Sequence, residues 1–121
     1  MESKAVNLKE KFTKFTDFWS PRIIAQINDY QFKIARVKGD FTWHDHKETD
    51  EAFMVIDGEL RIDFRDGSTV VRAGELLVVP KGVEHKPCAE EECRIMLIEP
   101  AGTVNTGDAG GDKTKLTEEW V

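Results

Sequence analysis

The sequence predicts an all-β domain whose strands close into a barrel or sandwich, preceded by one short helix. Within residues 59–65 every second side chain is apolar and those between are charged, which is the two-residue period of a strand with one buried face. Asp57-Gly58 and Asp66-Gly67 flank this segment, and such dipeptides favour tight hairpin turns. Further short apolar segments rich in β-branched or aromatic residues predict strands at residues 23–27, 30–37, 52–56, 69–72, 75–79 and 93–98.

The helix is predicted over residues 7–19. Asn7 and Glu10 are spaced as a cap and its reciprocal partner, and Pro21 ends the helix. We expect its apolar side to lie against the outside of the sheet. Four apolar residues recur at helical spacing: Leu8, Phe12, Phe15 and Trp19.

Length and composition predict a single domain over residues 1–121. The barrel is expected at about residues 23–99 and a polar, glycine-rich tail at residues 100–121. Hydrophobic residues make up 40% of the chain and charged residues 33%, proportions typical of a globular protein with a packed core. In the tail, Trp120 either docks on the body or a partner subunit or belongs to a loosely attached end.

Charge and hydropathy argue against two classes of partner. The net charge is -6, so the basic surface that binds nucleic acid is not expected. No segment approaches the roughly 20 apolar residues that span a bilayer, and no secretory signal is recognisable, so we expect no membrane partner and a cytoplasmic location. Cys88 and Cys93 are then expected to be free thiols.

The three histidines and one glutamate of a metal site are the most informative residues. His44 and His46 are two residues apart, so on an extended strand both imidazoles project to one face. Glu51 begins the next predicted strand, and His85 lies beside a later one. Imidazole and carboxylate suit a divalent transition metal ion such as Fe, Mn, Ni, Cu or Zn, and four such ligands leave coordination positions open.

Three other acidic residues near the histidines are alternatives to Glu51 as a ligand. Asp45 points away from its histidine neighbours on an extended strand, and Glu48 and Asp50 precede the strand, so Glu51 is favoured. Trp43 falls on the face opposite the histidines and is expected to pack against a neighbouring layer or subunit. Residues 90–92, all glutamate, are expected to form a solvated turn.

These residues resemble the two short motifs of the cupin superfamily over roughly residues 23–99. Two departures occur: four residues separate Gly39 from His44 where five are commoner, and Ala89 stands where the second motif often closes with Asn. The first motif comprises Gly39, His44, His46, Glu51 and Gly58, and the second comprises Gly74, Pro80, Gly82 and His85.

The resemblance implies a cupin-type double-stranded β-helix, or jelly-roll barrel, with His44, His46, Glu51 and His85 as metal ligands. It also implies a homodimer, and aromatic residues in excess of what a small barrel needs agree with a partner surface.

A metal held this way can polarise a carbonyl or hydroxyl, as in isomerases and lyases, or support oxidative cleavage if it is redox-active. We therefore expect an enzyme acting on a small organic molecule in an apolar pocket lined by residues such as Phe53, Val55, Leu60 and Ile62. The alternative is a non-catalytic module that binds or senses a small ligand. The catalytic acid or base is unknown, with Tyr30, Arg36 and Arg94 of uncertain orientation.

Overall fold

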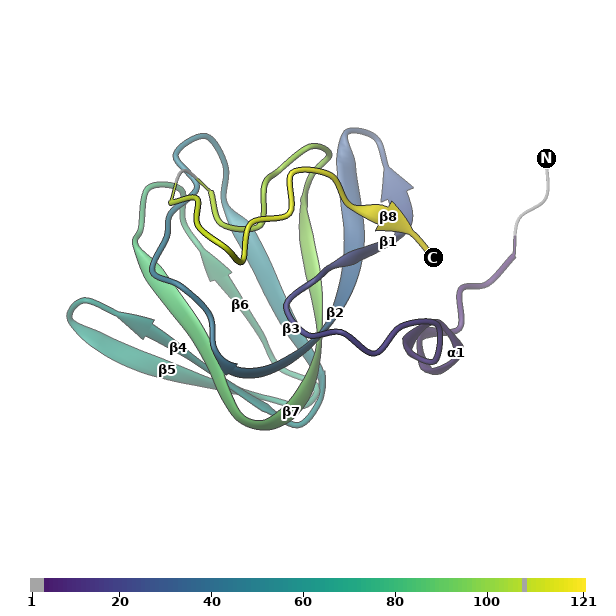
Figure 1. Cartoon of the computed structure of the whole chain (residues 1–121), viewed down its shortest axis with the longest axis horizontal. Coiled ribbons are helices and arrows are strands. Elements are labelled where there is room, and N and C mark those ends of the chain that lie inside the picture. The colour runs from purple at the N-terminus through teal and green to yellow at the C-terminus, as the bar shows by residue number, and fades with distance from the viewer. Residues whose placement is uncertain (1–3, 108) are drawn as a thin grey trace.

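The computed structural model of the chain describes residues 4–107 and 109–121, which form a β-barrel with one short helix outside it (Figure 1). The elements are α1 (Leu8–Phe12), β1 (Arg22–Ile27), β2 (Tyr30–Asp40), β3 (Glu51–Asp57), β4 (Glu59–Phe64), β5 (Gly67–Arg72), β6 (Leu76–Val79), β7 (His85–Pro100) and β8 (Glu119–Trp120). The all-β jelly-roll prediction is confirmed, and all seven predicted strands are present.

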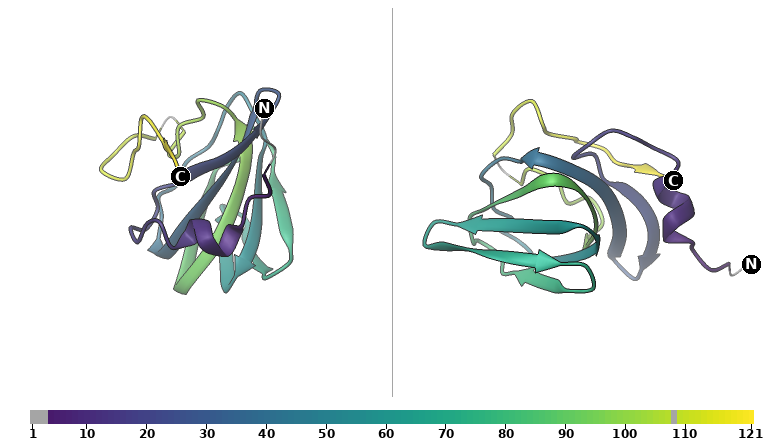
Figure 2. Two further views of the ribbon diagram at one scale, coloured as in Figure 1. Left: turned by 90° about the vertical axis from the view of Figure 1, so that its right-hand side faces the viewer. Right: turned by 90° about the horizontal axis from the view of Figure 1, so that it is seen from below.

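Two layers of strands share β7, which is the longest strand. Its later part pairs with β2 and β3, and its first part, from His85 to Cys88, pairs with β4. Strand β6 extends the first layer beside β3, and β5 extends the second beside β4. Figure 2 shows the two layers facing each other across the barrel interior.

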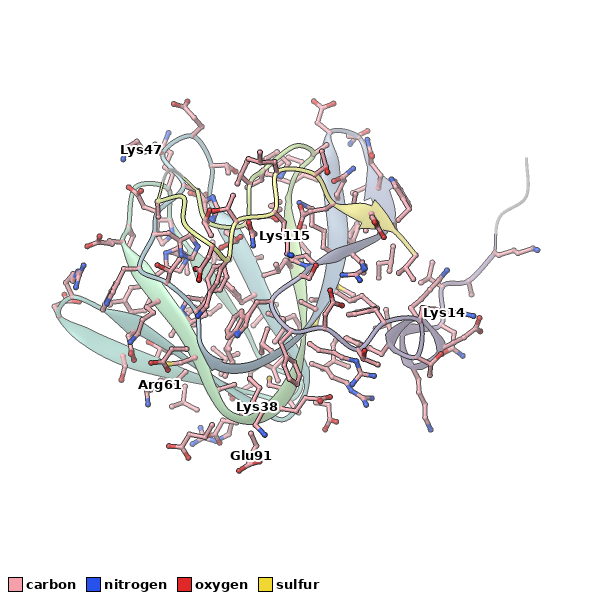
Figure 3. All side chains as sticks on the ribbon, in the orientation of Figure 1. Lys14, Lys38, Lys47, Arg61, Glu91 and Lys115 are labelled. Atoms are coloured by element: carbon pink, nitrogen blue, oxygen red, sulfur yellow. The ribbon has the colours of Figure 1, made fainter. Side chains whose placement is uncertain are left out.

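Along the strands, every second residue points inward, and these side chains fill the barrel interior. In β3 the buried positions are Glu51, Phe53 and Val55, and the residues between them face outward. Most of the inward side chains form one apolar core that includes Leu60, Ile62 and Ile95. Charged side chains such as Lys38 and Glu91 lie at the periphery (Figure 3).

The prediction of a turn at residues 90–92 is wrong, because these residues belong to β7. These glutamates are exposed, as expected, but they lie within a strand rather than a turn. The pairing with β2 moves from Gly39–Ala89 to Val37–Cys93, so the glutamates form a bulge where β7 passes between the layers. A bulge places extra residues in solvent without ending the strand, and a local sequence pattern does not distinguish this from a turn.

The helix is shorter than predicted, because α1 ends at Phe12 rather than continuing to residue 19. The Asn7 side chain accepts a hydrogen bond from the Glu10 amide, which confirms Asn7 as the cap. Beyond the helix, the Arg36 guanidinium donates to the carbonyl oxygens of Phe12 and Phe15, at 2.7 and 3.0 Å. These bonds to β2 replace the ones that a longer helix would make, and the following residues run along the sheet.

The apolar side of α1 covers the outer face of the first layer, as the sequence predicts. Phe12 and Phe15 form a second core with Ile24, Ile34 and Met96 from β1, β2 and β7. The helix covers only part of this face. At its far edge, Leu76 and Val78 of β6 remain 65% and 49% exposed.

Candidate metal centre

The backbone places two histidines opposite each other at one end of the barrel. His44 follows β2, and its amide and carbonyl exchange hydrogen bonds with those of His85, at 3.0 and 2.9 Å. The carbonyl of His46 accepts a hydrogen bond from the Gly82 amide at 2.9 Å. Both halves of the site, distant in sequence, are thus joined by main-chain hydrogen bonds.

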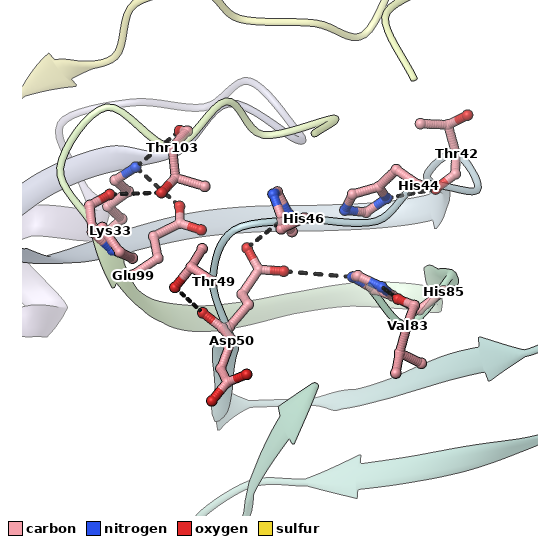
Figure 4. Close-up of polar contacts among 12 residues, drawn as sticks. Lys33, Thr42, His44, His46, Thr49, Asp50, Val83, His85, Glu99 and Thr103 are labelled. Atoms are coloured by element: carbon pink, nitrogen blue, oxygen red, sulfur yellow. Dashed lines mark hydrogen bonds and ion pairs between the residues drawn. The ribbon is translucent and has the colours of Figure 1, made fainter. Parts of the chain in front are cut away.

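Hydrogen bonds to carbonyl groups set the orientation of two imidazoles. His44 Nδ1 lies 2.9 Å from the Thr42 carbonyl oxygen, and His85 Nδ1 lies 2.9 Å from that of Val83 (Figure 4). A carbonyl only accepts, so in each neutral ring the proton is on Nδ1 and the Nε2 lone pair is left for another partner. Hydrogen bonds of this kind orient histidine ligands in metal sites.

The four predicted residues converge on one point. Within the described residues, the candidate ligand atoms of His44, His46, Glu51 and His85 all lie within 4.8 Å of one another. His46 Nε2 is 3.4 Å from Glu51 Oε2, and His85 Nε2 is 3.5 Å from Glu51 Oε1. All four residues are buried, with exposures of 3%, 7%, 3% and 1% in that order.

Unsatisfied polar atoms test whether a metal ion fits. His46 Nε2, Glu51 Oε1 and His85 Nε2 are buried and have no hydrogen-bond partner. Leaving such atoms without a partner is costly, and a shared cation would satisfy all three. Three nitrogen donors and one carboxylate are also a donor set that divalent transition metals accept. The residues therefore fit a metal ion.

Electrostatics hold two of the side chains in the protonation state that binds metal. Burial, followed by the neighbouring His85, lowers the pKa of His44 to about 4, so this imidazole is neutral at pH 7. Burial raises the pKa of Glu51, but contacts with His46, His85 and Glu99 outweigh burial and hold that pKa well below its usual range. For His46, burial lowers the pKa, and the contact with Glu51 more than reverses this effect.

A second buried polar group, not anticipated from the sequence, adjoins the four residues. Lys33 Nζ lies 2.9 Å from Glu99 Oε1 and 2.5 Å from Glu118 Oε1. Burial, followed by the charge of Glu51, raises the pKa of Glu99 well above its usual range. Lys33 and Glu99 occupy inward positions of β2 and β7. A charged residue where the alternation of a strand predicts a buried side chain is the sequence feature that could have indicated this buried group.

An apolar cavity lies beside the site and encloses about 30 Å³. Its polar lining residues are His44, Glu51 and Asn105, and Trp19 stacked on Phe41 at 4.8 Å forms part of its wall. This space is large enough to admit a water molecule beside the candidate ligands.

The predicted pocket residues are only partly confirmed. Phe53 lines the cavity. Val55, Leu60 and Ile62 do not line this cavity, although they share one packed core with Phe53.

The remaining candidates lie away from the cluster. Asp45 is within 3.4 Å of Lys47, and the Asp50 carboxylate accepts the Lys81 amide at 2.9 Å, so neither joins the four ligand atoms. Glu48 is likewise outside the group. Trp43 packs under the Arg65 guanidinium, whose central carbon is 3.7 Å from the ring centre.

The three side chains considered as acid or base do not reach the site. Arg36 binds carbonyl groups below the helix, Arg94 lies over the Phe12 ring, and Tyr30 is 46% exposed. Cys88 and Cys93 are buried free thiols, as expected.

A jelly-roll barrel with three inward histidines and one glutamate is the architecture of the cupins, and the chain belongs to this family. The cupin domain model matches residues 33–99. A cupin-2 domain containing protein from Shewanella frigidimarina is 57% identical, with a TM-score of 0.78, covering 78% of this chain and 93% of that one. Protein NMB1881 from Neisseria meningitidis is 36% identical, with a TM-score of 0.74, covering 81% and 100%.

The chain also resembles the uncharacterized protein YdbB from Bacillus subtilis. The two are 39% identical over 83 residues, which is 68% of this chain and 67% of YdbB. Across residues 4–107 and 109–121, no helix has the length and apolar character needed to cross a bilayer.

Proposed function

We propose that this cupin is a metal-dependent enzyme that acts on a small organic molecule, with His44, His46, Glu51 and His85 as ligands of one divalent transition metal ion. The observation that carries the proposal is the convergence of four buried ligand atoms within 4.8 Å, beside an apolar cavity. The ion is Fe, Mn, Ni, Cu or Zn, the metals that this donor set accepts.

The site's own residues support binding and orientation of both ion and substrate. Thr42 and Val83 fix the tautomers of His44 and His85 through their carbonyl groups, and the Glu51 carboxylate faces the same point from β3. A bound divalent ion supplies Lewis-acid polarisation, or electron transfer if it is redox-active. The apolar lining of the adjoining cavity suits the carbon skeleton of a small organic molecule, and the proposed reaction is of an isomerase, lyase or dioxygenase type.

Metal content tests this proposal directly. Protein purified without added chelator is expected to carry close to one equivalent of a transition metal, because the buried donors are otherwise unsatisfied. Elemental analysis measures the stoichiometry and identifies the ion, which separates redox from Lewis-acid chemistry. Metal-free protein that also takes up no ion when offered Fe²⁺, Mn²⁺, Ni²⁺, Cu²⁺ and Zn²⁺ separately would refute the proposal.

We also propose that two copies pair through the outer face of the first layer. Two rows of apolar residues cross β6, β3, β7 and β2 on this face, as the strand register shows. Helix α1 covers the β2 end, whereas the β6 end is exposed. The rows are Leu76, Met54, Met96 and Ile34, and Val78, Ala52, Ile98 and Phe32.

Light scattering after size exclusion is expected to report about twice the 13.8 kDa chain mass for the wild type. The change Leu76→Glu is expected to shift the protein to monomer, because it introduces a charge into the apolar face. Leu116→Glu is the control, since Leu116 is 81% exposed on the C-terminal segment. A monomeric wild type at micromolar concentration, or a Leu76→Glu variant that remains dimeric, would contradict the pairing.

A further inference from the structure

The C-terminal segment, residues 101–121 apart from residue 108, is docked on the barrel rather than loosely attached. It runs across the barrel end that holds the metal centre (Figure 1). Thr106 is fully buried and Asn105 is 8% exposed, which is unusual for polar residues of a tail. At the end of the segment, β8 pairs with β1, and Lys11 Nζ donates to the Val121 carbonyl at 2.8 Å.

Side-chain hydrogen bonds close the middle of the segment on itself. Asn105 Nδ2 donates to the Lys113 carbonyl at 2.9 Å, and Asn105 Oδ1 accepts from the Lys115 amide at 2.8 Å. The hydroxyls of Thr106 and Thr114 are 2.6 Å apart. The segment is therefore an ordered unit that can dock as a whole.

This unit lies directly on the backbone that carries two of the histidines. A Cβ atom added at Gly107 would be 1.8 Å from the carbonyl oxygen of Asp45 and 3.5 Å from His46 Nδ1. Asp45 separates His44 from His46, so the segment lies against the main chain that carries two of the candidate ligands. Asn105 also forms part of the cavity wall with His44 and Glu51.

The segment is anchored inside the barrel by one buried ion pair. Lys33 Nζ lies between Glu99 of β7 and Glu118 of the segment, and the side-chain exposures of Lys33, Glu99 and Glu118 are 1%, 1% and 7%. The Thr103 carbonyl is a further acceptor for Lys33 Nζ at 3.4 Å (Figure 4). The ammonium group of Lys33 thus holds the segment to an inward-facing residue of β7.

We propose that Glu118 is a positioning residue of the metal centre: through Lys33 it docks the C-terminal segment over the site. This inference rests on the proposed metal site. It assigns a role to a segment whose sequence alone indicated only a polar tail, outside the two cupin motifs.

Charge balance gives the physical reason for this coupling. Even with Glu99 neutral, Glu51 and Glu118 bring two negative charges against the one positive charge of Lys33. A divalent cation beside Glu51 offsets this excess in a region of low dielectric constant. Docking of Glu118 therefore strengthens cation binding, and by linkage the cation strengthens docking of the segment by the same factor.

Glu118→Gln tests the coupling, with Glu119→Gln as the matched control because Glu119 is the exposed neighbouring residue in β8. Zn²⁺ affinity is measured by competition with a chromogenic chelator. Glu118→Gln is expected to bind Zn²⁺ about tenfold more weakly than the wild type, the lower end of effects of residues that support ligands. Glu119→Gln is expected to match the wild type. Equal Zn²⁺ affinity for the wild type and Glu118→Gln would overturn the inference.

A second measurement needs no substitution. Amide hydrogen exchange of the wild type is compared with and without Zn²⁺, and the amides of Lys115 and Val121 are expected to exchange several-fold more slowly with Zn²⁺ bound. Zn²⁺ that binds without slowing these amides would overturn the coupling and leave the metal site intact. A wild type that binds no Zn²⁺ or other ion would instead defeat the proposed function.

Discussion

Replacing His85 by alanine is expected to remove most of the bound metal. His85 Nε2 is one of the buried atoms that lack a partner, and the residue is 1% exposed, so solvent cannot readily supply a substitute ligand. Four-ligand zinc sites bind with about 10–16 kcal/mol, and an equal share per ligand is about 2.5–4 kcal/mol. This share corresponds to a loss of affinity of about a hundredfold or more.

Elemental analysis of the purified variant, after dialysis against a weak chelator, measures this loss. Asp45→Ala is the control, because Asp45 lies between two of the candidate ligands and yet stands outside the cluster. The control is expected to retain the wild-type metal content. If His85→Ala kept one full equivalent under the same dialysis, the assignment of His85 as a ligand would be wrong.

Lys33→Met is expected to produce the largest loss of folding stability. Burial lowers the pKa of Lys33, but Glu99 and Glu118 more than compensate, so the ammonium group is charged throughout the range below pH 10.5. Removing one partner of a buried ion pair leaves the opposite charges uncompensated, at a cost of about 3–5 kcal/mol. Because the folded-state pKa is raised, the contribution of Lys33 is present below pH 10.5 and is lost only as the pH rises above it.

Urea denaturation of the metal-free protein at pH 7 measures the free energy of unfolding. Lys38→Met is the matched control, since Lys38 is exposed on the same strand. The double variant Lys33→Met/Glu118→Leu is expected to recover part of the loss, because it removes an uncompensated carboxylate. A Lys33→Met variant as stable as Lys38→Met would show that the buried pair contributes nothing to folding.

The barrel and the four candidate ligands could be predicted because their signals are local. Alternation in residues 59–65 and the Asp-Gly dipeptides define strands and turns within a few residues. His44 and His46 are two residues apart, so the two-residue period of a strand also predicts that their side chains project to the same face. Their approach to His85 was not given by any such period; it followed from the motif resemblance, and the main-chain hydrogen bonds between His44 and His85 supply its physical basis.

The features that were missed depend on contacts between distant parts of the chain. Helix α1 ends early because Arg36, far along the sequence, binds the carbonyl groups of Phe12 and Phe15. The C-terminal segment is polar in composition, and its docking follows from the partner of Glu118, which is Lys33. Neither partner is adjacent in sequence, so no local pattern identifies these contacts.

Strand β7 has a consequence for how the molecule acquires its structure. It is hydrogen-bonded to β4 at its beginning and to β2 and β3 towards its end, and it carries His85 at one extremity and Glu99 near the other. Neither half of the barrel can be completed without this one late-synthesised strand. Because its pairings span long stretches of sequence, assembly has to close large loops before it gains stability, and topologies of this kind fold more slowly than those built from local contacts.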